Sequence, residues 1–375
     1  MGRNGTGVKA ATENSIQIDF VYKGIRCRER IKRKPTPANL KLVERHREAI
    51  LHAINNDSFD YAVTFPNSKL LYKFIEPSEL TVRSWVSQWL HKKTPHLKLS
   101  TLNGYEKCIK VIIDQFGHIK LSELKRKEVR AWCESLTVSN KTIANRVSIL
   151  RAALHDACSD ELIESNVLSD FTFKRNEPPK VSDVDPFNQE EQEAICNALT
   201  GHMQNLIKFA FWTGLRTSEL VALEWRDVDW ERETVHVRRA KTQYARVAET
   251  TKTKAGTREV RLLQPAKEAL LAQKELTCKE GKQIFLNPYT ETSWLGDQAI
   301  RKAWVIALRK AGVRYRRPYQ TRHTYASMML SAGENLAWVS KQLGHSSVIM
   351  TASVYATWIP NSQPEAGNKA VDLFS

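Results

Sequence analysis

The chain has 375 residues, enough for two or three domains, and its 42% hydrophobic and 26% charged residues are typical of a globular protein. The 57 Lys and Arg residues outnumber the 41 Asp and Glu residues, and the formal net charge of +16 favours a polyanionic partner such as nucleic acid. No apolar run approaches the roughly 18 residues of a membrane span, and the N-terminus lacks the apolar core of a signal peptide. We therefore expect a cytoplasmic protein with no membrane contact.

The six cysteines are far apart and form neither a CxxC pair nor a Cys/His cluster with zinc spacing. This spacing is typical of buried, reduced thiols. The sequence therefore predicts no disulfide, no structural metal and no cofactor.

The first segment, residues 1–73, predicts a small β-hairpin followed by a helix. Residues 15–22 alternate apolar and polar, Lys23-Gly24 suits a tight turn, residues 25–31 form the second strand, and residues 39–54 have a helical pattern. The hairpin is basic, with Arg26, Arg28, Arg30 and Lys32. Two interpretations stay open: a hairpin that reads a DNA groove, or a solvated edge strand whose charge prevents aggregation.

The second segment, residues 76–175, predicts a bundle of four short helices. Trp85 and Trp89 belong to an apolar stripe with i, i+3, i+4 spacing, which favours core packing over base stacking. In the last helix, residues 139–158, Lys141 and Arg146 lie on another face and are predicted DNA contacts. A Pro-rich polar stretch, residues 173–185, has the composition of a linker.

The third segment, residues 186–360, predicts a mixed α+β domain, and residues 361–375 predict a loosely held tail. The chain as a whole is expected to be multidomain and mainly α, with small β elements. Four separated motifs stand out in this segment: TGLRTSEL at 213–220, TKTKAGTREVRL at 251–262 with Gly256 in a predicted hairpin turn, YQTRHT at 319–324, and LGH at 343–345 followed by Tyr355.

Each motif alone is typical of ordinary packing or surface chemistry, but together they supply two arginines, a lysine, a histidine and a tyrosine. Two guanidinium groups can hold the non-bridging oxygens of a phosphodiester and stabilise the charge of its transition state without a metal ion. The tyrosine is then a covalent nucleophile, and the lysine or histidine moves protons. The combination predicts phosphodiester cleavage by a tyrosine.

With these motifs in this order, the sequence resembles the tyrosine recombinase (phage integrase) family. The run SIQIDFVYKGIRCRER followed by PTPANL is similar to the arm-type DNA-binding domain of prophage integrases, and the second segment resembles their helical core-binding domain. The resemblance implies that Tyr355 is the nucleophile and that Arg216 and Arg322 are the phosphate clamp. It also implies that Lys252, or alternatively Lys254, protonates the leaving 5′-oxygen.

The same resemblance assigns His345 to a hydrogen bond with the scissile phosphate and Glu219 to the support of Arg216. Many family members have a histidine three residues before the second arginine, where this chain has Tyr319. A phenol donates a hydrogen bond but is a poor base near neutral pH. The neighbouring His323 is expected to be structural.

The resemblance implies integration and excision of a prophage through a 3′-phosphotyrosine intermediate. The implied partners are double-stranded DNA at phage and host attachment sites, a homotetramer on that DNA, an excision factor and DNA-bending host proteins, all at the nucleoid of a bacterial host. Two alternatives stay open. One is a nicking–closing enzyme of the type IB topoisomerase kind, and the other is a catalytically silent DNA-binding regulator.

Overall fold

The computed structural model describes residues 7–65, 68, 70, 73–74, 79–178, 183–245, 248–250, 254–278 and 281–359. The chain divides into two compact units, Met1–Pro178 and Pro179–Ser375, which are considered separately below. Within the described ranges, no helix combines the length and the apolar character needed to cross a lipid bilayer.

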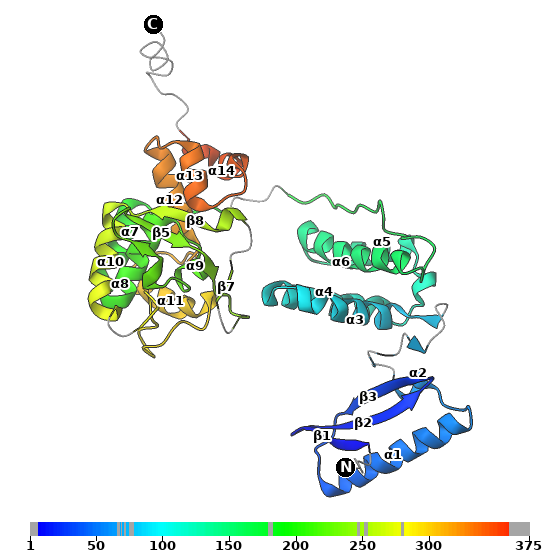
Figure 1. Cartoon of the computed structure of the whole chain (residues 1–375). Coiled ribbons are helices and arrows are strands. Elements are labelled where there is room, and N and C mark those ends of the chain that lie inside the picture. The colour runs from blue at the N-terminus through cyan, green and yellow to red at the C-terminus, as the bar shows by residue number, and fades with distance from the viewer. Residues whose placement is uncertain are drawn as a thin grey trace. The chain divides into compact units, whose positions relative to one another are not determined.

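The N-terminal part of the first unit is a three-stranded antiparallel sheet with one covering helix. The strands β1 (Val8–Thr12), β2 (Ser15–Tyr22) and β3 (Ile25–Ile31) pair in the order β1-β2-β3, and helix α1 (Pro37–Asn55) covers one face (Figure 1). The predicted hairpin and helix are confirmed. Strand β1 was not predicted, because its sequence VKAAT has no large apolar residue at alternate positions and it forms by pairing with the edge of β2.

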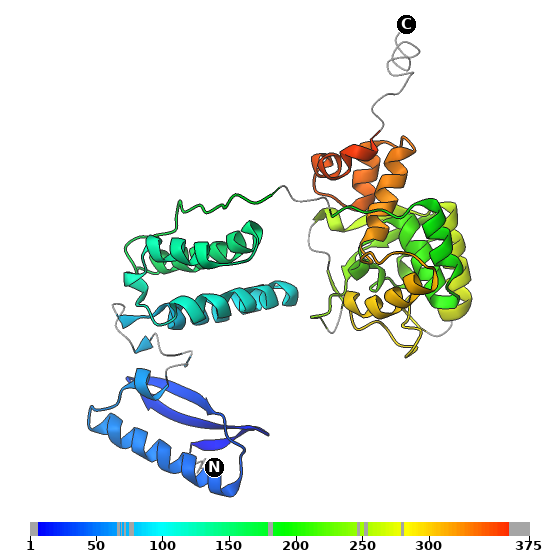
Figure 2. The ribbon, with the colours of Figure 1, turned by 180° about the vertical axis from the view of Figure 1, so that it is seen from behind.

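The rest of the first unit is helical, as predicted. After the short helix α2 (Tyr61–Thr64), it contains α3 (Val82–Lys93), α4 (Leu99–Phe116), α5 (Arg126–Ser135) and α6 (Asn140–Ser159). Helices α3, α4 and α6 pack against one another (Figure 2). The indole nitrogens of Trp85 and Trp89 donate to Ala153 O and Asp156 Oδ2, both at 2.7 Å. The tryptophan stripe is therefore core, and its polar atoms are satisfied inside the bundle.

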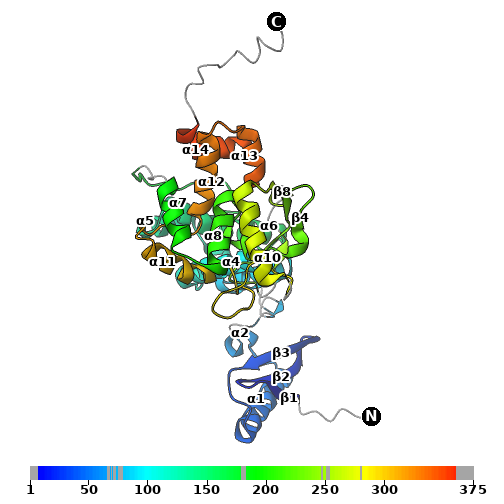
Figure 3. The same cartoon turned by 90° about the vertical axis from the view of Figure 1, so that its left-hand side faces the viewer.

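The second unit packs helices around two small β ladders. Its helices are α7 (Gln189–Asn197), α8 (Gly201–Thr213), α9 (Thr217–Leu220), α10 (Gln264–Thr277), α11 (Ile300–Lys310), α12 (Gln320–Ser331), α13 (Leu336–Leu343) and α14 (Val348–Tyr355). One sheet has the order β4 (Val228–Asp229), β5 (Thr234–Val237), β8 (Arg258–Arg261), and β6 (Arg239–Ala240) pairs with β7 (Glu249–Thr250). Helix α8 packs against both α10 and α12, which is why it is apolar on nearly all sides (Figure 3).

Two glycines end helices where the backbone must turn sharply. Gly214 ends α8 with φ 61°, and a Cβ there would lie 2.5 Å from Tyr325 Cδ1. Gly344 ends α13 with φ 68°, and a Cβ there would lie 2.8 Å from the carbonyl oxygen of Ala255. Only glycine readily adopts this φ and also leaves room for the neighbouring atoms. The two turns therefore determine the positions of Arg216 and His345, which follow them in the chain.

Candidate active site

Arg216 is the N-cap residue of α9 and is held by the helix that it begins. Its Nη1 donates to Glu219 Oε1 at 2.7 Å, and its backbone N–H donates to Glu219 Oε2 at 2.9 Å. The side chain is 33% exposed, so the guanidinium is anchored on one side and reaches solvent on the other. Glu219 therefore contacts both the side chain and the backbone of Arg216.

Arg258, which the sequence analysis missed, binds the same carboxylate from strand β8. Its Nη2 and Nη1 donate to the two oxygens of Glu219 at 3.0 and 3.1 Å, and its Nε donates to Gln342 O at 2.6 Å. Burial alone would raise the pKa of Glu219, but the charges of Arg258 and Arg216 hold it below its usual value. The available signal was the strand alternation, because Arg258 shares the inward face with Val260.

Arg322 lies in α12 and is almost fully buried, with 1% of its surface exposed. Its Nη1 donates to Gly214 O at 2.9 Å, whereas its Nε and Nη2 find no hydrogen-bond partner among the described residues. Burial, together with the charge of Arg216, lowers the pKa of Arg322 to about 10. A buried cation with two donors that find no partner among the described residues is costly to the fold, and an anion bound at this position would satisfy both donors.

His345 directly follows the turn at Gly344. Its Nδ1 is 2.7 Å from Thr351 Oγ1. Burial and the charges of Arg322 and Arg216 lower the pKa of His345 to about 4, so the ring is neutral at pH 7. A neutral imidazole can still donate one hydrogen bond to a bound phosphate.

Tyr355 is the last residue of α14 and is 1% exposed. Its hydroxyl oxygen is 2.7 Å from His323 Nδ1, and its pKa is raised by burial. Tyr319, which is 41% exposed, places its ring 5.1 Å from that of His323. The charge of Arg216 acts on Arg322 and the charge of Arg322 acts on Tyr355, so the fold brings these three side chains together, with His323 in contact with Tyr355.

The two candidate lysines lie between β7 and β8 in the sequence. Lys252 lies outside the described residues, and Lys254 begins a short 3-10 turn, Lys254–Gly256. The predicted hairpin around Gly256 is wrong, because Gly256 ends a 3-10 turn and the flanking strands do not pair with each other: β8 pairs with β5, while β7 pairs with β6. The carbonyl oxygen of Ala255 lies close to Gly344, so this 3-10 turn lies next to the turn that precedes His345.

A groove of about 1020 Å³ begins at His345 and runs along β5, β8 and α13. Its lining is rich in cations: Arg232, Arg238, Arg261 and Lys341. An open basic groove that includes His345 is suited to a polyanionic backbone.

In the N-terminal sheet, the predicted DNA contacts alternate along β3. Arg26, Arg28, Arg30 and the following Lys32 are all exposed. Arg26 Nη2 is 2.7 Å from Asp19 Oδ2, and Arg28 Nε is 3.5 Å from the same oxygen. The hydrogen bond from Arg26 lowers the pKa of Asp19, so this carboxylate offsets part of the charge of Arg26. Arg30 and Lys32 extend the basic row beyond that pair.

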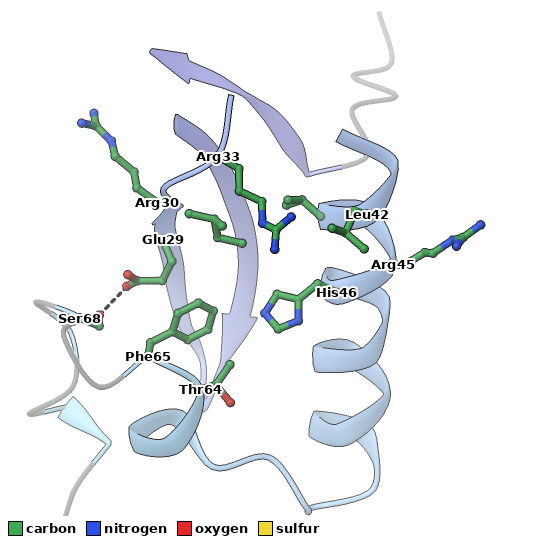
Figure 4. Close-up of a pocket in the computed structure, with 11 residues that line it drawn as sticks. Glu29, Arg30, Arg33, Leu42, Arg45, His46, Thr64, Phe65 and Ser68 are labelled. Carbon is green, nitrogen blue, oxygen red and sulfur yellow. Dashed lines mark hydrogen bonds between the residues drawn. The ribbon is translucent and has the colours of Figure 1, made fainter. Parts of the chain in front are cut away.

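A pocket of about 730 Å³ lies between β3, α1 and the residues after α2 (Figure 4). Arg33 and His46 point into this pocket, whereas Arg30 and Arg45 point away from it. Glu29 at its edge accepts a hydrogen bond from Ser68. Arg30, the predicted DNA contact among these residues, therefore projects outward rather than into the pocket.

In the helical bundle, the two remaining predicted contacts lie on α6. Lys141 is exposed and Arg146 is half-buried, while Ile143 and Val147 on the same helix are buried in the core. Helix α6 thus offers a polar face of the kind that the sequence predicts for DNA.

Three family models match the chain. The phage integrase family matches residues 186–360, an arm DNA-binding domain matches residues 5–69, and the SAM-like N-terminal domain of phage integrases matches residues 81–137. The prophage integrase IntR of Escherichia coli (strain K12) is 31% identical over 93% of this chain and 94% of its own length. The chain belongs to the phage integrase family. It is a tyrosine recombinase, an enzyme that breaks and rejoins DNA in site-specific recombination.

Solved structures show that this recombinase shares its fold with DNA-bound integrases. The Tn1549 transposon integrase in complex with a circular intermediate DNA covers 79% of this chain and 100% of its own, with a TM-score of 0.61 and 19% identity. A lambda integrase tetramer bound to a Holliday junction covers 92% of this chain and 97% of its own, with a TM-score of 0.57 and 14% identity.

A second sequence relative is the putative defective protein IntQ of Escherichia coli (strain K12), which is 31% identical over 84% of the recombinase and 88% of its own length.

Proposed function

We propose that this recombinase integrates and excises a mobile element through a 3′-phosphotyrosine intermediate, with Tyr355 as the nucleophile. The observation that carries the proposal is the buried guanidinium of Arg322, which has two donors without a partner among the described residues. The charge of Arg322 affects the pKa of Tyr355, and the charge of Arg216 affects the pKa of Arg322, so the three side chains lie close together. A phosphate oxygen is an anion that satisfies both donors.

In this scheme, the phenolic oxygen of Tyr355 attacks the phosphorus, and the bond to the 5′-oxygen breaks. Arg216 and Arg322 hold the two non-bridging oxygens and stabilise the charge that develops on them. His345 donates a further hydrogen bond. The product is a 3′-phosphotyrosine and a free 5′-hydroxyl, and attack by the 5′-hydroxyl of a partner strand reverses the step. The bond energy stays in the phosphotyrosine, so no nucleotide cofactor or metal ion is needed.

The leaving 5′-oxygen requires a proton, and a lysine of the connection between β7 and β8 supplies it. Lys252 is the first candidate and Lys254 the second. The two are distinguished with a substrate in which sulfur replaces the bridging 5′-oxygen, because a thiolate leaves without protonation. Alanine at the proton donor slows cleavage of ordinary DNA but not of this substrate.

The assembly follows the domain plan of residues 1–73, 76–175 and 186–360, with residues 361–375 as a tail. Residues 1–73 bind arm sites, and the other two domains bind the core site at phage and host attachment sequences. Four copies act together, and the similar fold of a lambda integrase tetramer on a Holliday junction supports this stoichiometry. An excision factor and DNA-bending host proteins are the proposed accessory partners.

A covalent trapping assay tests the proposal. Duplexes that carry candidate attachment sites are nicked near the crossover point, so that the short released strand diffuses away and religation fails. We expect a denaturation-resistant protein–DNA adduct that disappears in Tyr355→Phe, while duplex binding by that variant is retained. An adduct that persists in Tyr355→Phe assigns the nucleophile elsewhere. Relaxation of a supercoiled plasmid without strand exchange identifies a nicking–closing enzyme instead.

A further inference from the structure

We propose that His323 accepts the phenolic proton of Tyr355 when the tyrosine attacks the phosphodiester. This inference rests on the proposed function, because it takes Tyr355 as the nucleophile. It also assigns chemistry to a residue that the sequence suggested was structural.

The geometry is that of a donor and an acceptor in direct contact. His323 Nδ1 lies 2.7 Å from the hydroxyl oxygen of Tyr355, an ordinary distance for a strong hydrogen bond. The phenol keeps its proton at neutral pH, because burial raises its pKa further. The ring of His323 is neutral at pH 7, since burial and the charge of Arg322 lower its pKa to about 4. With the ring proton on Nε2, Nδ1 accepts the hydrogen bond from the phenol.

The neighbouring groups are less suited to this role. His345 is neutral as well, but its Nδ1 is engaged with Thr351. Tyr319 is a phenol, which cannot take a proton from another phenol near pH 7. Glu219 is occupied by two arginines.

The electrostatics explain why the proton transfers only on DNA. Two charged groups act on His323: Arg322 disfavours its protonation and Asp183 favours it. The rings of Tyr319 and Tyr355 contact the imidazole. His345 lies nearby. A phosphodiester bound to Arg322 adds a negative charge that offsets this guanidinium and raises the pKa of His323. The tyrosine proton also becomes acidic as the oxygen–phosphorus bond forms. Both changes occur only when substrate is bound, so the free enzyme keeps its nucleophile protonated.

The step balances in both directions. During cleavage, the Tyr355 O–H bond breaks, the proton moves to His323 Nδ1, and the oxygen forms a bond to phosphorus while the 5′-oxygen leaves with a proton from the proposed lysine donor. During rejoining, a 5′-hydroxyl gives its proton to that lysine and attacks the phosphorus, the phosphotyrosine bond breaks, and the imidazolium returns its proton to the phenolic oxygen. His323 is therefore the base of one half-reaction and the acid of the other.

The test compares His323→Asn and His323→Ala with the unaltered enzyme on the nicked trapping substrate. Asparagine Oδ1 can accept the hydrogen bond from Tyr355 but takes up no proton, so it separates proton transfer from positioning. We expect both variants to bind the duplex normally and to form the adduct about 10²–10⁴-fold more slowly. The acid limb in the pH profile of the unaltered enzyme is expected to be absent in both. Both variants are expected to remain slow on the sulfur-bridged substrate, because that substrate removes only the need to protonate the leaving group.

Adduct formation by His323→Asn at the wild-type rate, with an unchanged pH profile, overturns the inference and reduces His323 to a positioning role. If that variant does not bind DNA, His323→Gln, whose amide also accepts a hydrogen bond but no proton, is measured in its place under the same criterion. The unaltered enzyme and Tyr355→Phe separate this failure from that of the proposed function. No adduct with the unaltered enzyme, or an adduct that survives Tyr355→Phe, rejects Tyr355 as nucleophile regardless of His323.

Discussion

Glu219 and Arg258 form a buried, two-pronged ion pair that joins helix α9 to strand β8, with nitrogen–oxygen distances of 3.0 and 3.1 Å. The same carboxylate holds Arg216 at 2.7 Å. One acidic side chain therefore fixes the position of a proposed clamp arginine relative to the sheet. The pair is part of the scaffold, but the position of Arg216 depends on it.

The first prediction concerns Glu219→Gln. The change leaves Arg258 buried beside a neutral amide, so we expect a loss of about 3–5 kcal/mol in the free energy of unfolding, measured by urea denaturation. Adduct formation is also expected to fall, because Arg216 loses its anchor. Glu231→Gln, at an exposed position in the same unit, is the matched control and is expected to change neither quantity. Wild-type stability of Glu219→Gln would refute the role assigned to this ion pair.

The second prediction concerns Arg322→Met, which removes a buried cation while keeping much of its volume. Arg322 is costly to the fold, because two of its donors find no partner among the described residues. We therefore expect this variant to keep or exceed the wild-type Tm while its adduct formation falls by at least about 10²-fold. Thermal unfolding and the trapping assay measure the two effects.

A phosphate titration provides an independent check of the same site. Inorganic phosphate is expected to raise the Tm of the wild type through binding to the folded state, and to raise that of Arg322→Met less. An equal response of the two proteins to phosphate would place the anion site elsewhere.

The third prediction concerns pH. Burial and neighbouring arginines lower the pKa values of His323 and His345 to about 4, below the ordinary 6.5. Between these values the unfolded chain binds more protons than the folded one, so stability is fully present above pH 6.5 and falls as the pH drops toward 4. We expect the Tm of His323→Gln to fall less steeply across this window than that of the wild type. The exposed His118→Gln is the control, and an identical slope for both variants would contradict the prediction.

The fourth prediction concerns arm-site DNA. Arg28 and Arg30 are exposed residues of β3. Replacing both with Gln is expected to weaken DNA binding. The slope of log K against log salt is expected to fall in magnitude by roughly 0.9 for each phosphate that the protein no longer neutralises. Replacing Lys41 and Arg45 on α1 removes the same charge from another element and is expected to leave the slope nearly unchanged. Fluorescence anisotropy at several salt concentrations measures both. Equal slopes for the two double variants would show that net charge, rather than β3, governs binding.

Local sequence patterns were sufficient for most elements. The alternation in residues 15–22 and the helical pattern in residues 39–54 each act over a few neighbouring residues, so both elements were predicted and are present in the structure. Strand β1 and the pairing of β8 with β5 were not predicted, because both depend on an edge supplied by another part of the chain.

The sequence by itself determined the family, the order of its segments and the residue types of the site, because motif spacing and residue chemistry are carried along the chain. Only the tertiary structure decided which of those side chains share a carboxylate and which buried cation has two donors unpaired among the described residues. It also decided that His323 contacts Tyr355 across 32 residues of sequence. These features arise from packing between α9, β8, α12 and α14. Contacts of this kind depend on which surfaces are buried together, and no local pattern records that.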